Sequence, residues 1–209
     1  MATHFGFEPS TDRGYYFISY NTEDADRVSA ICNYLYKAGV KIWYDAGIPH
    51  DSNWHGILAE KIDKSEEVIF FITKGIFRKA KERQLKQSEV YPYLEYDMAK
   101  FYEKKTLIVV LDEIGRNDLP YELMHWWQEI NPSVKQGVLG INTELNEVAR
   151  RILHELGFKN VYSIEDDIKF AVFNSVVDHP EYGDEREFIH IRQRGDSKWH
   201  RSMKLVADR

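Results

Sequence analysis

The stretch from Tyr15 to Asn21 constrains the fold of this chain more than any other, because it passes from an apolar run directly into a turn. Its first residues are aromatic or β-branched, which is typical of a strand, and the lack of polar alternation places that strand inside a sheet. Thr22 and the acidic residues after it suit the N-terminus of a helix. In an open α/β sheet, Ser19 and Tyr20 would lie at the mouth of a ligand crevice. A second interpretation stays open, in which Ser19 and Asn21 only shape the turn.

Helix and strand patterns alternate along most of the chain. Apolar residues spaced by three and four predict helices over 24–38, 54–64, 88–102, 121–128 and 143–156. Apolar or β-branched runs predict further strands over 40–45, 67–73, 106–112 and 137–141. Residues 74–87 are basic and weakly patterned, and we interpret them as a short helix and an exposed loop. The alternation predicts an α/β fold: a flavodoxin-like, doubly wound parallel sheet of five strands in the order 2-1-3-4-5.

The two ends of the chain lack this pattern. Residues 1–13 show no periodicity and are expected to form a loose lead-in to a main domain over 14–158. Residues 159–209 are interpreted as a C-terminal extension in which 187–191 and 199–206 form two strands, as in a β-hairpin packed on the domain.

Composition narrows the classes of protein. The formal net charge is −6, which disfavours non-specific binding to nucleic acid. No apolar run approaches the roughly 18 residues of a membrane span, and the N-terminus lacks the features of a signal peptide. The single cysteine, Cys32, cannot form an internal disulfide and lies on the apolar face of an expected helix. We therefore expect it in the core of a cytoplasmic protein.

Several familiar cofactor and catalytic motifs do not occur in the sequence. No glycine-rich loop follows the first strand, so neither a dinucleotide-binding fingerprint nor a phosphate-binding loop fits. No nucleophile elbow follows any expected strand. His50, Asp51 and His55 lie close together, but their spacing matches no common zinc site. We therefore expect neither a metal nor a resident cofactor.

Candidate site residues gather at one edge of the predicted sheet. The carboxyl ends of its first three strands carry Ser19, Tyr20, Asp45 and Thr73.

The helix predicted from Ser88 adds a carboxylate to that edge. Tyr91, Glu95 and Ala99 are spaced by four, so they share one face of the helix. Glu95 therefore has an aromatic ring one turn before it and only a methyl group one turn after it. Such surroundings raise the pKa of a carboxyl group and suit it to chemistry, although an ordinary solvated glutamate remains the other interpretation.

Four stretches, in the same order along the chain, resemble motifs of Toll/interleukin-1 receptor (TIR) domains. They are Phe17 to Tyr20, Gly39 to Asp45 with the loop and tryptophan that follow, Val68 to Thr73, and Ser88 to Ala99. The resemblance covers about residues 14–158. The basic segment 78–87 is additional to the family's pattern, and we expect it to lengthen a flap over the pocket.

The resemblance implies an activity. Many bacterial and plant TIR domains are NAD+ glycohydrolases or cyclases, which cleave the bond between nicotinamide and ribose. The family's glutamate corresponds to Glu95, and an aromatic residue that is often Trp corresponds to Tyr91. NAD+ would then be a substrate, and no other cofactor is implied. We expect the substrate to contact Ser19, Tyr20, Asp45, Trp54, Thr73 and Tyr91.

Other functions remain open. The chain could be a non-catalytic TIR adaptor that acts by self-association, or an enzyme similar to nucleoside deoxyribosyltransferases. If the chain is an enzyme, its arrangement resembles that of the TIR protein of Thoeris anti-phage defence. That protein releases an ADP-ribose-derived signal, which activates a separate effector protein. Residues 159–209 would then act as a lid that excludes water from the pocket, and the alternatives are a structural prop or a dimer contact.

Overall fold

The computed structural model describes residues 5–11, 13–45, 53–131 and 137–158 with their side chains, and further along only the backbone of short strands within 168–204. The chain divides into two units, Met1–Ile152 and Leu153–Arg209.

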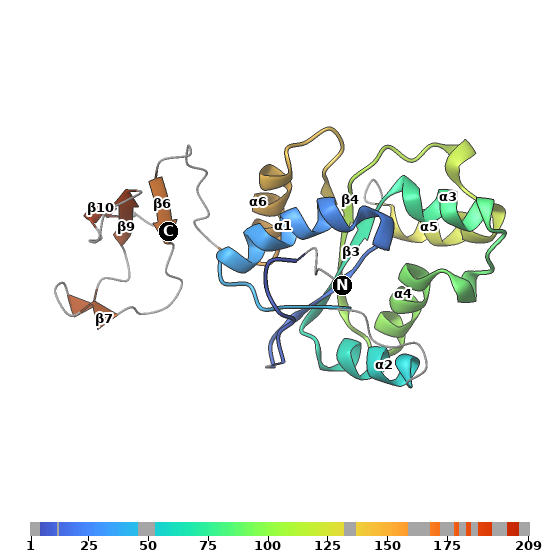
Figure 1. The fold of residues 1–209 in the computed structure, drawn as a ribbon, viewed down its shortest axis with the longest axis horizontal. Helices are drawn as coiled ribbons and strands as arrows, with labels where there is room; N and C mark the ends of the chain where they lie inside the picture. Colours follow the sequence, from blue (N-terminus) through green and yellow to red (C-terminus); the bar gives the residue numbers. More distant parts are fainter. Residues whose placement is uncertain are drawn as a thin grey trace. The chain divides into compact units, whose positions relative to one another are not determined.

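The first unit is built on a parallel sheet of five strands in the order β2-β1-β3-β4-β5 (Figure 1). The strands are β1 (Tyr16–Ser19), β2 (Ile42–Tyr44), β3 (Glu67–Ile72), β4 (Lys105–Val110) and β5 (Gly137–Leu139). All six residues of the central strand β3 are buried, as expected for a strand covered on both faces. The predicted fold class and strand order are confirmed.

Helices connect the strands close to the predicted positions. They are α1 (Ala25–Lys37), α2 (Trp54–Lys64), α3 (Lys74–Glu82), α4 (Tyr91–Phe101), α5 (Met124–Ile130) and α6 (Leu145–Glu155), with 3-10 turns η1 (Thr22–Asp24), η2 (Gln87–Glu89), η3 (Arg116–Asp118) and η4 (Tyr121–Leu123). The helix predicted from Ser88 begins only at Tyr91, because η2 occupies the preceding residues and Pro92 fits only the first turn. No helix in the described ranges is both long and apolar enough to cross a membrane.

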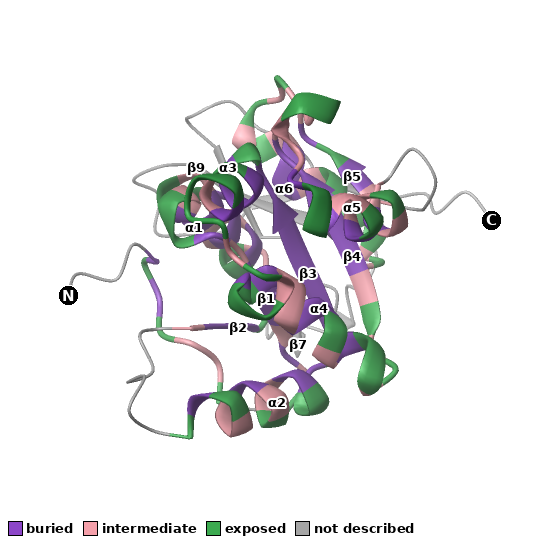
Figure 2. Ribbon diagram, turned by 90° about the vertical axis from the view of Figure 1, so that its right-hand side faces the viewer, coloured by how far each residue is buried: buried purple, intermediate pink, exposed green. Residues whose placement is uncertain are grey.

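The two faces of the sheet are covered by different helices. Alternate strand residues such as Phe17 and Phe70 belong to one core cluster with residues of α2, α3, α4 and α5. The residues between them, such as Ile18 and Phe71, are also buried and point to the opposite face. Helices α1 and α6 lie next to each other on that side, and the purple, buried strands in Figure 2 run between the two layers. Cys32 of α1 is fully buried there, as predicted.

The lead-in differs from the expectation. Phe5 stacks on Tyr44 of β2 with ring centroids 3.8 Å apart, and Phe7 stacks on Tyr36 of α1 at 4.3 Å. The Tyr44 hydroxyl also donates a hydrogen bond of 2.6 Å to the carbonyl of Phe7. The loose lead-in predicted for residues 1–13 is therefore wrong for this part, because two aromatic rings have enough apolar surface to fix it against the edge strand.

The second unit contains a small antiparallel sheet. Its strands are β6 (Ile168–Ala171), β9 (Phe188–Gln193) and β10 (His200–Lys204) in the order β10-β9-β6, and β7 (Asp178–His179) pairs with β8 (Gly183–Asp184). The two strands expected in this region correspond to β9 and β10, which pair antiparallel, whereas β6 was not expected. The proposed lid over the pocket lies outside the described residues.

A polar network joins the carboxyl ends of β1 and β3. Asp24 accepts hydrogen bonds from Asn21 Nδ2 at 3.0 Å and from Thr73 Oγ1 at 2.6 Å. Gly75, in the first turn of α3, lies so close that an added Cβ would be 2.7 Å from Asn21 Nδ2 and 2.9 Å from Asp24 Oδ2. The network therefore requires a residue without a side chain at position 75.

We expect Gly75→Ala to destabilise the fold by about 1–2 kcal/mol, because the new methyl group must displace a hydrogen-bonded pair of side chains. Gly115→Ala is the matched control, since a Cβ at Gly115 would meet only Asp118 Oδ2 at 3.4 Å. Thermal denaturation of the two variants measures the difference. Equal melting temperatures would show that the network yields to the methyl group without loss.

Candidate active site

The site is centred on a hydrogen bond between β1 and α4. Ser19 is the last residue of β1 and, like Phe17 two residues earlier, points to the face that α4 covers. Its hydroxyl donates to Oε2 of Glu95, in the second turn of α4. Both side chains are buried, with exposed fractions of 1% for Ser19 and 7% for Glu95. Residues 76 positions apart thus meet at the carboxyl edge of the sheet.

Burial changes the acidity of this carboxyl group. Removal from water raises the pKa of Glu95 to about 8, and the negative charge of Asp45 raises it further, whereas the hydrogen bond from Ser19 lowers it. Glu95 is therefore mostly protonated at neutral pH, and it becomes a carboxylate more readily when another group stabilises its charge. A carboxyl group in this condition, at the crevice of an α/β sheet, is a candidate for catalysis.

Tyr20 lies beside this pair and stays neutral. Burial raises the pKa of its phenol to about 12, and the charges of Asp45 and Glu95 act in the same direction. Its ring contacts Phe5 edge-to-face, with centroids 5.6 Å apart. The phenol thus remains a hydrogen-bond donor in the neighbourhood of both carboxyl groups.

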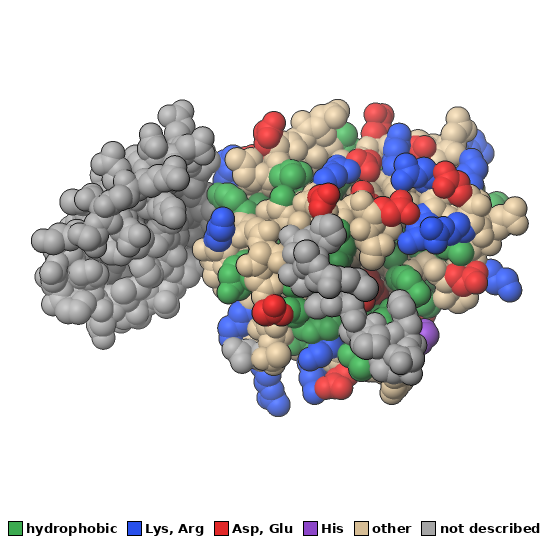
Figure 3. Space-filling view, in the orientation of Figure 1, with side chains coloured by type: hydrophobic (Ala, Val, Ile, Leu, Met, Phe, Trp, Pro, Cys, Tyr) green, Lys and Arg blue, Asp and Glu red, His purple; other side chains and the backbone are tan. Residues whose placement is uncertain are grey.

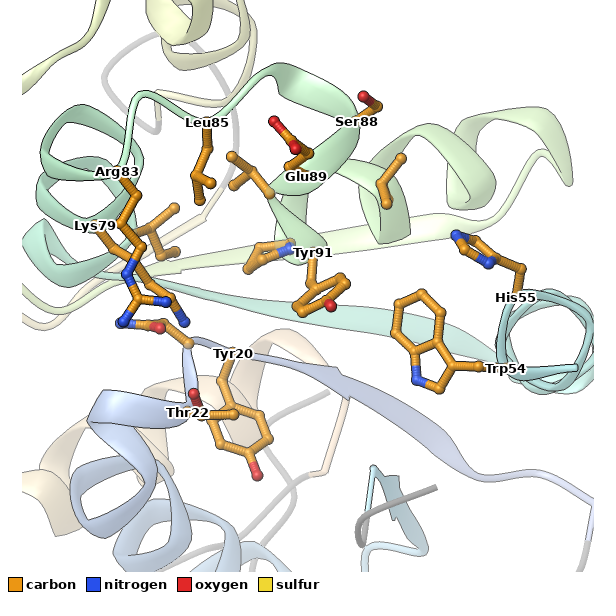
Figure 4. A pocket seen from close by; sticks show the side chains of 15 residues that line it. Tyr20, Thr22, Trp54, His55, Lys79, Arg83, Leu85, Ser88, Glu89 and Tyr91 are labelled. Atoms are coloured by element: carbon orange, nitrogen blue, oxygen red, sulfur yellow. The ribbon is translucent and has the colours of Figure 1, made fainter. Parts of the chain in front are cut away.

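A cavity of about 490 Å³ opens next to Tyr20. This volume lies within the range of small-molecule sites. Tyr20, Trp54 and Tyr91 supply aromatic walls, and the rings of Trp54 and Tyr91 meet at an angle of 60° with centroids 4.9 Å apart (Figure 4). Because the two rings are in edge contact, they form one aromatic wall against which a flat heterocycle could lie.

The two ends of the cavity differ in chemistry. Lys79 and Arg83 of the α3 region lie at one end, together with Thr22, and His55 lies at the other end beside Trp54 (Figure 4). The His55 and Trp54 rings are in edge contact, with centroids 4.7 Å apart. The cavity therefore offers positive charge at one end and aromatic surface at the other.

The expected site residues fall into two groups. Tyr20, Trp54 and Tyr91 line the cavity, and Trp54 is at the same time a core residue with 6% of its surface exposed. Ser19 and Glu95 do not line the cavity, whereas Tyr20 and Leu94, their neighbours in sequence, do. The buried pair and the aromatic cavity are thus adjacent.

Two expected contacts take a different place. Thr73 is fully buried and its hydroxyl donates a hydrogen bond to Asp24, which holds the turn, and its contact with a substrate stays a prediction. Asp45 does not line the cavity and acts on the site through its charge, which reaches Glu95 and Tyr20.

The sequence interpretation did not identify Lys79 and Arg83 as site residues. It treated 78–87 only as a basic segment that lengthens a flap, although Lys79 and Arg83 are spaced by four and so share a helix face. Leu85 and Ser88 near the end of that segment also line the cavity. The spacing was the available signal, but only the folded chain shows which face meets the cavity.

Metal-binding chemistry has no candidate in the described part of the chain. No group of three or more His, Cys, Asp or Glu side chains converges there. His50 and Asp51, which the sequence interpretation considered beside His55, lie outside the described residues.

Comparison with solved structures finds several TIR domains with low sequence identity. The TIR domains of the activated Roq1 resistosome are 14% identical and cover 68% of this chain and 99% of theirs, with a TM-score of 0.49. The RPS4 and RRS1 TIR domain heterodimer is 15% identical and covers 69% of this chain and 96% of its own, with a TM-score of 0.46. A metazoan TIR-STING receptor from C. gigas is 16% identical, and the match covers 70% of this chain and 43% of the receptor chain, with a TM-score of 0.41. No match was found among the curated proteins.

Comparison with protein families gives a direct assignment. The model of the TIR domain family matches residues 17–134, which is more than half of the chain and runs from β1 to beyond α5. The matched part contains both Ser19 and Glu95. The chain therefore belongs to the TIR domain family.

Proposed function

We propose that this protein is an NAD+-cleaving enzyme, a glycohydrolase or cyclase that breaks the bond between nicotinamide and ribose. The observation that carries the proposal is Glu95, a buried carboxyl group whose pKa is raised to about 8, on the helix whose residues Tyr91 and Leu94 line an aromatic cavity. TIR domains include both NAD+-cleaving enzymes and scaffolds, so the family alone does not decide between them. The geometry around Glu95 favours the enzyme.

A single carboxylate is sufficient for this reaction. Nicotinamide leaves NAD+ as a neutral pyridine, so the leaving group needs no proton, and the transition state resembles the oxocarbenium ion of other glycosides. An ionised Glu95 would accept hydrogen bonds from the ribose hydroxyls and stabilise the positive charge that develops at the sugar. The Tyr91 ring, which is 43% exposed, would stack on the nicotinamide ring, and Trp54 packs against Tyr91 in an edge contact.

Ser19 supplies a way to control the charge of Glu95. In the free protein its hydroxyl occupies Oε2 of Glu95 and favours the ionised form. A ribose hydroxyl that approached from the cavity would replace or join this bond. The positive pyridinium of NAD+ would favour ionisation further, so substrate binding itself would prepare the carboxylate.

Glu95→Gln is expected to lower kcat for NAD+ by about 100-fold or more while the protein stays folded, because an amide cannot stabilise the oxocarbenium ion by charge. Release of nicotinamide, followed by chromatography, measures it. Asp97→Asn is the matched control, since Asp97 is exposed on the same helix two residues further on. Wild-type turnover by Glu95→Gln would remove this residue from the chemistry.

The pH dependence tests the role of Ser19. If ionised Glu95 is the active form, kcat/KM rises with pH and levels off above the pKa of about 8. In Ser19→Ala the bond that lowers this pKa is lost, so the midpoint of the profile moves to higher pH. Ser29→Ala, which removes a hydroxyl bonded to the carbonyl of Asp26 in α1, should leave the midpoint in place. A midpoint that stays the same in Ser19→Ala would show that another group controls the profile.

The identity of the product depends on which nucleophile reaches the ribose carbon. Exclusion of water is the largest cause of the raised pKa of Glu95, and a dry site favours a nucleophile from the substrate or a second molecule over water. We therefore expect mass spectrometry of the reaction to show an ADP-ribose-derived product other than plain ADP-ribose. Such a product would act as a signal to a separate effector protein in anti-phage defence. Only ADP-ribose and nicotinamide in the mixture would contradict this.

A scaffold that acts by self-association is the second candidate. Glu95 is covered by its surroundings, and large apolar side chains such as Phe101 and Tyr121 are 79% and 86% exposed. Absence of NAD+ cleavage by wild-type protein, together with concentration-dependent assembly in light scattering, would favour this function. An enzyme similar to nucleoside deoxyribosyltransferases would instead exchange the bases of deoxynucleosides, which chromatography of the reaction mixture would detect.

A further inference from the structure

The surface over α3 concentrates positive charge in a protein whose formal net charge is −6. Figure 3 shows Lys and Arg side chains gathered there among Asp and Glu. The basic side chains on α3 and at its C-terminal cap are Lys74, Arg78, Lys79, Lys81 and Arg83.

Three of these five basic side chains have partners within the protein. Ion pairs of 3.4 Å and 3.1 Å hold two of them, and a hydrogen bond of 3.1 Å to a carbonyl oxygen holds the third. The partners are Asp118 for Lys74, Glu23 for Arg78 and the carbonyl of Asn117 for Lys81. The remaining two, Lys79 and Arg83, form no side-chain hydrogen bond or ion pair with any residue in the described part of the chain.

The two cations without such a partner are also the two that line the cavity. Lys79 and Arg83 are spaced by four, so their side chains leave the same face of the helix. Figure 4 shows both extending toward the cavity end where Thr22 lies, across from the aromatic end formed by Trp54 and His55. The hydroxyl of Thr22 adds a hydrogen-bond donor at this end. Among the described residues that line the cavity, Glu89 is the one with a carboxylate, and it accepts a hydrogen bond of 2.7 Å from the backbone N–H of Lys86.

We propose that Lys79 and Arg83 form a subsite for the diphosphate of a nucleotide ligand. This inference rests on the proposed cleavage of NAD+, because it assigns the anionic part of that substrate to the cationic end of the cavity. A guanidinium and an ammonium together suit the two phosphates, since Arg binds oxyanions through paired N–H groups and Lys through a mobile point charge. The subsite stands in place of the glycine-rich phosphate loop that the sequence does not contain.

The subsite also defines the class of substrate. The aromatic end would receive a flat ring, Glu95 lies on α4 one turn after Tyr91 of that end, and the cations lie at the opposite end. A ligand that reaches both ends needs a ring, a ribose and a diphosphate in sequence. The enzyme would therefore use dinucleotides well and nicotinamide riboside, which has no phosphate, poorly.

Binding of ADP-ribose, ADP and adenosine by isothermal titration calorimetry tests the subsite without requiring catalysis. We expect the double variant Lys79→Ala/Arg83→Ala to bind ADP-ribose and ADP at least about tenfold more weakly, with no change for adenosine. The matched control is Arg78→Ala/Lys81→Ala, which removes the same charge from the same helix but from side chains outside the cavity. Melting temperatures of both variants confirm that they are folded.

The subsite would be overturned if wild-type protein bound neither ADP-ribose nor ADP, or if the double variant bound both with unchanged affinity. An equal loss of affinity for ADP-ribose in the control pair would also overturn it, because the effect would then be a general one of charge. A parallel assay of NAD+ cleavage separates this proposal from the proposed function. Cleavage with unchanged ADP-ribose affinity in the double variant would reject only the subsite. Phosphate-dependent binding without any cleavage would reject only the enzyme.

Discussion

Burial of the central strands on both faces is the constraint on which this site depends. Because β1 and β3 are covered by helices on each side, a polar side chain at their carboxyl ends must find its partner inside the protein. Ser19 finds Glu95 on α4, and Thr73 finds Asp24 beside α1. The first bond holds a carboxyl group whose pKa is raised by burial next to a cavity, and the second fixes the turn that forms part of the same edge. The sheet thus determines both the location of the site and its acidity.

Much of the fold could be predicted from the sequence because its signals are local. The apolar runs that form β1, β3 and β4 and the spacing that forms α1 and α6 do not depend on distant residues. Glu95 could be identified as a candidate because Tyr91 and Ala99 share its helix face and because the motifs occur in the order found in TIR domains. The start of α4 was placed three residues early, since the patterns of a 3-10 turn and a helix N-terminus are alike over so short a stretch.

The rest of the site depends on partners that are distant in sequence. Phe5 and Phe7 have no periodic pattern, and only the edge of β2 makes them part of the core. Thr73 lies at a strand end, as a substrate contact would, but Asp24 takes its hydroxyl. The basic neighbours of Lys79 and Arg83 are held by acidic side chains from other parts of the chain. Asp118 pairs with Lys74 and Glu23 pairs with Arg78. Sequence reasoning can place such residues on a face, but it cannot assign their partners.

The distribution of charge around the cavity follows the charges of the ligand that we propose. NAD+ carries a positive pyridinium and a negative diphosphate. The carboxyl group of Glu95 lies on the helix that supplies Tyr91 to the aromatic end of the cavity, and Lys79 and Arg83 lie at the other end. The net charge of −6 does not prevent binding of the diphosphate, because charges farther than a Debye length of about 8 Å are largely screened in physiological salt. The nearest side chains decide the local potential, and at this end they are Lys79 and Arg83. After nicotinamide leaves, the pyridinium charge is gone and ionised Glu95 loses its stabilisation. In the proposed reaction, the nucleophile that attacks the ribose carbon gives up a proton, and transfer of this proton to Glu95 would restore the neutral, buried state of the free protein.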